Sequence, residues 1–128
     1  MNKRSFTLVE MMIIVAVIGV LTAIAIPNLI KAKMSANDVA AQAGLRTIAT
    51  ALENYLIFNS SYPASVDALT GGVSPYLGKN YFSGTHSGFT FDPDIQPYSY
   101  IITADPVEVG KTGTTTFTIT TGAVFQNN

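Results

Sequence analysis

The sequence predicts an α+β protein in which a long N-terminal helix packs on a small antiparallel sheet of three to four strands. Residues 11–30 contain no Asp, Glu, Lys or Arg, in a chain of 128 residues that is 12% charged overall. A helical pattern continues to about residue 58, and short alternating segments follow it. Since about 20 apolar residues can cross a bilayer as a helix, a freely soluble globule is not expected.

The composition excludes several classes of function. The chain has no Cys and one His, and its formal net charge is −1. A disulfide framework and a thiolate metal site are therefore excluded. The basic residues after position 33 are Arg46, Lys79 and Lys111, too few for a nucleic-acid-binding face. The sequence contains no phosphate-binding loop or nucleophile motif, so we expect no enzyme, no cofactor and no nucleic-acid partner.

The first part of the predicted helix, residues 6–30, is long enough to span a membrane. It would form about 37 Å of helix, against a hydrocarbon core of roughly 30 Å. A secretory signal peptide has an apolar stretch of only about 7 to 15 residues, so the run does not fit that pattern. Basic residues lie on both sides of it, and Lys/Arg counting does not set the topology. We expect residues 6–30 to be a membrane anchor.

Three residues interrupt this apolar segment. A carboxylate such as Glu10 is costly in lipid and indicates a functional site, although it could also snorkel at the membrane edge or favour the positive end of the helix. Pro27 lacks an N–H and crowds the preceding turn, while Gly19 adds backbone freedom. We therefore expect a kink or local opening at Pro27 and a helix break between Gly19 and Pro27 in the filament, although Gly and Pro are common in membrane helices generally.

The N-terminus combines a basic start, Lys3-Arg4-Ser5, with the segment Phe6-Thr7-Leu8-Val9-Glu10 and a long apolar run after it. In these features the first 35 residues resemble the processing signal of type IV prepilins and type II secretion pseudopilins. The loop at 59–63 is similar to the one after the long helix of short pilins. Gly19 and Pro27 fall where similar pilins carry helix-breaking residues. Ser5 departs from the Gly usual in the family, but it is also small, and cleavage is still expected.

The resemblance implies how the N-terminus is processed. Residues 1–5 would be a basic leader, removed by prepilin peptidase between Ser5 and Phe6. The new amine of Phe6 would then be methylated. During assembly, Glu10 would form a salt bridge with the Phe6 amine of a neighbouring subunit.

The resemblance also implies a structural filament subunit. Such a subunit is stored in the cytoplasmic membrane with its globular part on the outer side, and polymerises into a cell-surface pilus or a periplasmic pseudopilus. Its partners would be further copies of itself, prepilin peptidase, an inner-membrane assembly platform and membrane lipid. The alternatives are the major pseudopilin of a type II secretion system and a single-pass anchored binding domain that does not polymerise. An anchored enzyme ranks behind both.

Residues 31–58 are predicted to continue the helix as an amphipathic half. The apolar residues recur at spacings of three and four, as on one face of a helix; they are Leu45, Ile48, Leu52, Tyr55 and Leu56. The helix should end near Phe58, because Asn and Ser residues follow and Pro63 prevents its resumption.

Residues 59–128 are predicted to form a C-terminal globular region with an antiparallel sheet. The expected strands are 89–91, 98–103 and 115–120, with 124–125 as a fourth, and the expected turns are 92–94 and 110–113. In the third strand Phe117 and Ile119 alternate with threonines, the period of a half-buried strand. This sheet could lie on the apolar stripe of the helix and form a shared core.

Other candidate sites are weaker. Four acids could ligate calcium, as in related pseudopilins: Asp92, Asp94, Asp105 and Glu108. Their spacing matches no known calcium loop, so we expect solvated turn acids and no metal site. His86 is expected at the surface. An aromatic set could be interpreted as an electron-conducting stack, but packing is the favoured interpretation; its members are Phe6, Tyr55, Phe58 and Tyr62.

Overall fold

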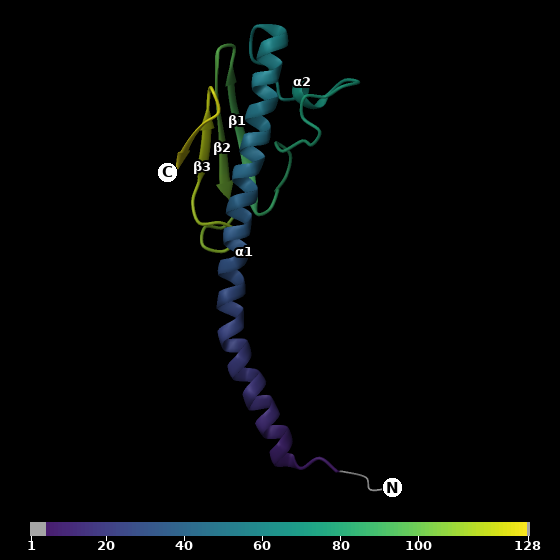
Figure 1. Cartoon of the computed structure of the whole chain (residues 1–128), viewed down its shortest axis with the longest axis vertical. Coiled ribbons are helices and arrows are strands. Elements are labelled where there is room, and N and C mark those ends of the chain that lie inside the picture. The colour runs from purple at the N-terminus through teal and green to yellow at the C-terminus, as the bar shows by residue number, and fades with distance from the viewer. Residues whose placement is uncertain (1–4, 128) are drawn as a thin grey trace. The chain divides into compact units, whose positions relative to one another are not determined.

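A computed structural model of the chain describes residues 5–127. Within these residues the elements are two helices, α1 (Leu8–Asn59) and α2 (Asp67–Thr70), and four strands, β1 (Phe89–Gln96), β2 (Ser99–Pro106), β3 (Phe117–Thr120) and β4 (Val124–Asn127) (Figure 1). The predicted α+β class is confirmed. The chain divides into two compact units, Met1–Ala32 and Lys33–Asn128, which are described separately below.

In the first unit, α1 is apolar and its side chains are exposed throughout residues 8–32. The helix is long and apolar enough to cross a membrane, and the apolar window that meets this test is not buried inside the protein. Thr22 donates its hydroxyl to the carbonyls of Ile18 and Gly19. A polar side chain in the apolar segment is thereby satisfied by its own helix.

The helix break expected between Gly19 and Pro27 is not seen in the single chain, where α1 continues through both residues. Pro27 removes the partner of one carbonyl, that of Ala23, and the turns on either side keep their bonds. Thr22 does not donate to that carbonyl but to two earlier ones. An opened segment in an assembled filament, where neighbouring subunits contact these residues, stays a prediction.

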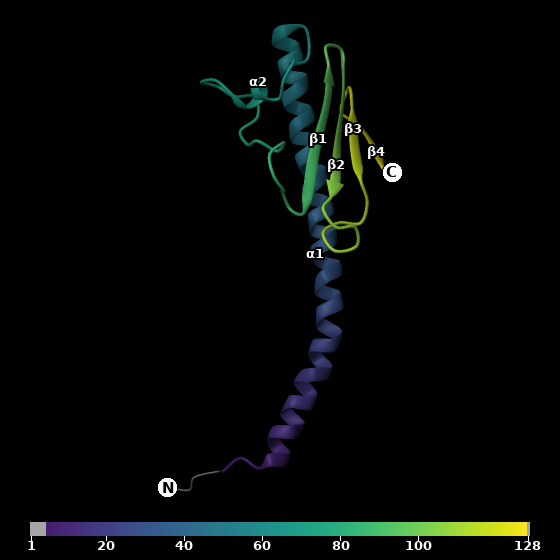
Figure 2. The same cartoon turned by 180° about the vertical axis from the view of Figure 1, so that it is seen from behind.

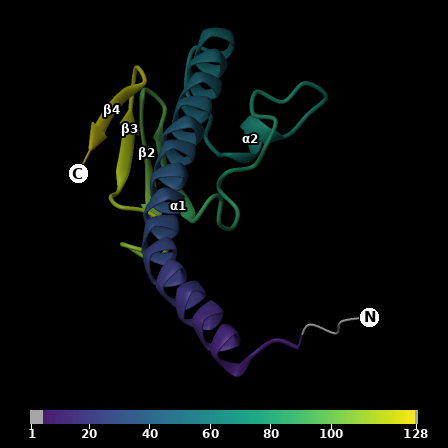
Figure 3. The same ribbon diagram turned by 60° about the horizontal axis from the view of Figure 1, so that its bottom comes forward.

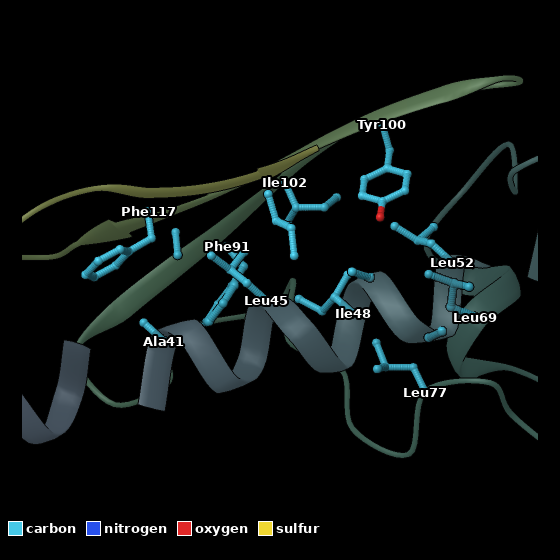
Figure 4. Packing of buried hydrophobic residues seen from close by; sticks show 14 of the residues in the cluster. Ala41, Leu45, Ile48, Leu52, Leu69, Leu77, Phe91, Tyr100, Ile102 and Phe117 are labelled. Atoms are coloured by element: carbon cyan, nitrogen blue, oxygen red, sulfur yellow. The ribbon is translucent and has the colours of Figure 1, made fainter. Parts of the chain in front are cut away.

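In the second unit, the remainder of α1 packs on a four-stranded antiparallel sheet of order β1-β2-β3-β4 (Figure 2). On the helix the predicted stripe is buried at Leu45, Ile48 and Leu52, and half-buried at Tyr55 and Leu56. Alternating residues of β1, β2 and β3 are buried in the core (Figure 4). They are Phe89, Phe91, Tyr100, Ile102, Ala104, Phe117 and Ile119. The helix and the sheet thus share one core, as the sequence predicted.

The segment between α1 and β1 covers another side of the helix. In all three ribbon views the sheet lies on one side of α1 and the α2 segment on the other (Figure 3). Leu69 and Leu77 from this segment are fully buried in the core. Gly44 lies where two rings approach α1, because a Cβ there would be 3.0 Å from Phe91 Cζ and 3.3 Å from Tyr81 Cε1.

A polar cluster around Glu53 connects the helix to three other parts of the second unit. Glu53 Oε1 accepts hydrogen bonds from Tyr62 Oη, Tyr100 Oη and the backbone N–H of Gly122, each at 3.1 Å. The N–H of Ala123 in turn donates to Tyr100 Oη. Burial and then the nearby Glu53 carboxylate raise the pKa of Tyr62 to about 12, and burial is also the main cause that raises the pKa of Tyr100.

The strand boundaries differ from the sequence prediction, most clearly in β1. Residues 92–94 were expected to form a turn, but they lie inside β1, with Pro93 opposite Ile102. β1 pairs with β2 alone, and an edge strand tolerates a proline because one side of its backbone needs no ladder bond. The expected turn at 110–113 lies within the β2–β3 connection, β3 begins at Phe117 and not at residue 115, and the expected fourth strand is present as β4.

Candidate functional site

The N-terminus of α1 carries a reciprocal set of hydrogen bonds between Thr7 and Glu10. The Glu10 N–H donates to Thr7 Oγ1 at 3.2 Å. In return, Glu10 Oε2 accepts from the Thr7 N–H at 2.8 Å and from the Thr7 hydroxyl at 2.9 Å. This is a capping box, in which the first turn of the helix satisfies N–H groups that would otherwise lack partners. Glu10 therefore starts the helix as well as being a candidate assembly residue.

Sequence reasoning missed the contribution of Thr7. The spacing Thr-x-x-Glu at positions 7 to 10, just before an apolar run, is itself the sequence pattern of a capping box. The cap also explains why α1 begins at Leu8 and not at Phe6, since the capping residue keeps a non-helical backbone.

The predicted cleavage point lies directly before this cap. Ser5, Phe6 and Thr7 are non-helical and exposed, and Phe6 is 72% exposed. A protease could therefore reach the bond between Ser5 and Phe6 without unwinding α1. In the uncut chain the Phe6 nitrogen is an amide, so the predicted ion pair with Glu10 has no cation yet. The rest of the predicted leader, residues 1–4, lies outside the described residues.

The candidate calcium ligands are engaged separately. Asp94 accepts from Gln96 at 3.1 Å, and Asp105 accepts from Thr116 at 2.7 Å. Glu108 forms a 2.7 Å ion pair with Lys111, and this pair raises the pKa of Lys111. Within residues 5–127, no three acidic or histidine side chains are grouped closely enough to hold a metal ion.

The remaining candidates lie in the second unit. His86 was expected at the surface, but it is half-buried, with its ring 5.6 Å from that of Tyr81 and its Nε2 buried without a partner among the described residues. Tyr62 packs in the core, edge-on to Tyr100 at 5.0 Å. Tyr55 and Phe58 both contact Tyr76, so this part of the aromatic set makes local packing contacts.

Comparison with known proteins places this geometry in a family. Residues 1–26 match the family model of the prokaryotic N-terminal methylation motif. The chain is 41% identical over 68 residues to the type IV wide pilus major component PilA4 of Thermus thermophilus, covering 53% of this chain and 52% of that protein. It is 37% identical over 80 residues to the type IV major pilin protein PilA of Myxococcus xanthus, covering 62% and 36%. The match thus spans about half of the first relative and about a third of the second.

A third similarity extends into the globular part. The chain is 31% identical over 105 residues to the type II secretion system core protein G of Pseudomonas aeruginosa, and the match covers 78% of this chain and 74% of that protein. All three relatives are named as pilins or as a secretion-system core protein and not as enzymes. With its methylation motif, its apolar helix and its antiparallel sheet, this chain belongs to the family of type IV pilins and type II secretion pseudopilins.

Proposed function

We propose that this chain is the structural subunit of a type IV pilus-like filament. It is held in the cytoplasmic membrane by residues 6–30, with its globular part on the outer side. Prepilin peptidase cuts it between Ser5 and Phe6, the Phe6 amine is methylated, and an inner-membrane platform then assembles it. The observation that carries the proposal is that three features follow one another along the chain at the expected spacing. They are an exposed segment at the predicted cut, a carboxylate on the first turn of α1, and an apolar helix long enough to cross a membrane.

The apolar helix serves first as an anchor and then as the filament core. Moving such a helix from lipid into a bundle of helices removes no apolar surface from water, so the hydrophobic effect does not drive this step. Packing and polar contacts between helices therefore decide which arrangement forms. In the first unit the carboxylate that can make such a contact is that of Glu10.

Glu10 is placed to recognise the amine that cleavage creates. That amine lies four positions before Glu10 in the chain, just ahead of the Thr7 cap, so a small axial offset between two subunits pairs the charges. Both Thr7 donors bind Oε2, and among the described residues no donor binds Oε1. An unpaired buried carboxylate costs about 3 to 5 kcal/mol, a penalty that falls on subunits assembled out of register.

The test is to express the chain with a prepilin peptidase and an assembly platform, shear the cells, and look for it in high-molecular-weight filaments. We expect filaments made of a chain that begins at Phe6. A protein that is cut but stays wholly in the membrane fraction would overturn the proposal and favour the anchored binding domain.

The second candidate is the major pseudopilin of a type II secretion system. It is favoured by coverage, since the similarity to core protein G covers 74% of that relative, against 52% and 36% of the two pilins. Restoration of enzyme export in a bacterium that lacks its own core protein G would support the pseudopilin role. Pilus-dependent motility or adhesion without restored export would support the pilin role.

A further inference from the structure

Two exposed apolar surfaces lie at opposite ends of the second unit. The first, the valine loop, is residues 107–113 of the β2–β3 connection, where Val107 is 52% and Val109 is 75% exposed. The second, the aromatic groove, is a hollow of about 570 Å³ lined by Asn54, Phe58, Ser74, Pro75 and Tyr76. Exposed apolar patches that are larger than scattered single residues mark interaction surfaces.

Hydrogen bonds brace the valine loop although it is exposed. The Val107 N–H donates to the carbonyl of Gly88, and the Gly110 N–H donates across the loop to the carbonyl of Gly113, both at 2.9 Å. The Glu108 N–H donates to Thr112 Oγ1 at 3.0 Å. Together these bonds hold the two valines in a fixed position, which lowers the entropy lost when they bind a partner.

Two residues of α1, Asn37 and Asp38, hold the valine loop and the residue after it through hydrogen bonds. Asn37 Nδ2 donates to the carbonyl of Thr112 at 2.7 Å. The Thr114 hydroxyl and N–H both donate to the carboxylate of Asp38, at 2.6 and 3.0 Å. The loop is thus fixed beside Asn37 and Asp38.

The aromatic groove lies at the far end of the same helix. Phe58 is 76% exposed, and its ring lies 6.3 Å from that of Tyr76. The ring of Tyr76 also packs edge-on against that of Tyr55, with ring centroids 5.2 Å apart. Val73 is fully exposed on the loop beside the groove. From Asp38 to Phe58 a helix rises about 30 Å. The segments that carry the two surfaces, the β2–β3 loop and the end of α1, lie at opposite ends of the unit (Figure 1).

Two different surfaces at opposite ends of one unit produce a heterologous contact when copies of the chain meet. A heterologous contact leaves one unused surface at each end of a dimer, so further subunits can add. If the rotation between successive subunits does not close a ring, the result is an open helical filament. We infer that the valine loop of one subunit inserts into the aromatic groove of a second copy of this chain, beside the contacts that the apolar helices make. The inference rests on the proposed filament function.

The chain suits a cysteine cross-linking test because it has no Cys of its own. The variant carries Val109→Cys and Phe58→Cys, both at exposed positions. Sheared filaments are treated with a mild oxidant and run on a non-reducing gel. If the loop and groove meet, a ladder of dimers, trimers and longer covalent oligomers is expected from the double variant, and monomer from each single variant.

The matched control is the pair Thr90→Cys and Gln126→Cys, two exposed positions on the opposite edge strands of the sheet. It should give filaments but no ladder. Filaments of the Val109→Cys, Phe58→Cys chain that yield no ladder would overturn the docking contact and leave the proposed function intact. Failure of the unaltered chain to form filaments would instead overturn the proposed function, and the contact with it.

A charge in the loop gives a second readout. Val109→Lys would place a charge in the groove of the next subunit, so we expect at least a several-fold loss of sheared filaments, with the membrane-bound and processed protein unchanged. Gln126→Lys, at an exposed site on β4, should leave the filament yield as it is. Equal filament yields from both variants would contradict the docking contact.

Discussion

At the scale of single residues, substitution can separate the capping contacts of Glu10 from its proposed role in assembly. Gln can replace Glu in a capping box, so Glu10→Gln keeps the hydrogen bonds to Thr7 and removes the charge. We expect membrane insertion and cleavage to remain largely intact, and filaments to be lost or strongly reduced, because the Phe6 amine then lacks a counter-ion. Glu10→Val should have the same effect. Sheared filament yield and the fraction of processed protein are the measurements.

The complementary variant is Thr7→Val, which removes the cap, at a cost of about 1 kcal/mol of helix stability, and keeps the carboxylate. It should assemble better than Glu10→Gln. Asp92→Asn and Asp94→Asn, changes to exposed acids on β1, should not affect assembly. If Glu10→Gln, as the only subunit, assembled like the unaltered chain, the cap would be the whole function of this residue.

Also at the residue scale, the cluster around Glu53 predicts a loss of stability at alkaline pH. In the unfolded chain a tyrosine ionises near pH 10, whereas the folded protein holds the Tyr62 proton to about pH 12 because of burial and the Glu53 carboxylate. Above pH 10 the unfolded state therefore binds fewer protons than the folded state, and the free energy of unfolding falls as the pH rises.

The measurement is urea unfolding of the intact protein in detergent between pH 8 and about 12. The midpoint should be steady up to about pH 10 and then decrease. Tyr62→Phe should be less stable at pH 8, because it loses the hydrogen bond to Glu53, but should show a smaller decrease above pH 10. Identical slopes for the two proteins would show that Tyr62 does not contribute to the pH dependence.

At the scale of elements, the contact between the β2–β3 loop and β1 is tight at Gly113. A Cβ at this position would overlap the buried ring of Phe89 and lie 3.0 Å from Asp38 Oδ1. Since neither a buried ring nor a hydrogen-bonded carboxylate can move freely, Gly113→Ala should lower the free energy of unfolding by about 1 to 3 kcal/mol. Gly78→Ala is the control, because no described atom lies within 4 Å of a Cβ there. Comparable losses for both variants would contradict the contact.

The segment of α1 between Gly19 and Pro27 carries a further prediction. The helix is regular here in the single chain, but Pro27 leaves one carbonyl without its helix partner and Gly19 favours other backbone angles. In a filament we expect the segment to open, which would let the filament stretch and bend. A filament reconstruction decides it, and regular helical density across residues 19–27 would refute the prediction. Pro27→Ala should restore regular helix and give stiffer filaments.

The elements also show what the sequence could predict. The end of α1 was predicted within one residue, because Asn, Ser and Pro63 are local signals that stop a helix. Phe117 and Ile119 were placed in the core by their alternation. The extension of β1 through Pro93 was missed, because a strand can contain a proline only where it lies at the edge of a sheet. Which strand lies at the edge is set by the topology of the whole sheet. The depth of His86 likewise depends on the distant rings of Tyr81 and Phe91.

At the scale of the whole molecule, the proposed life cycle predicts the covalent state of the mature chain. Intact mass and N-terminal sequencing of sheared material should give a protein that begins at Phe6 with a methylated amine. Ser5→Gly should raise the mature fraction without moving the cut, because Gly is the usual residue of the family at this position. A chain that still begins at Met1, or one cut near Ala25 or Ala32, would contradict the proposed processing.

The β1 edge of the sheet has a consequence for crowded subunits. An exposed edge strand can pair with the edge of a neighbouring molecule and fuse two sheets into one aggregate. In this chain Pro93 interrupts the row of N–H donors on edge strand β1, and the carboxylates of Asp92 and Asp94 flank it. At this edge, neighbouring globular units can then sit close together without merging their backbones. A polymer held only through side chains and helices can be taken apart again into folded subunits, whereas one joined by continuous β-pairing could not.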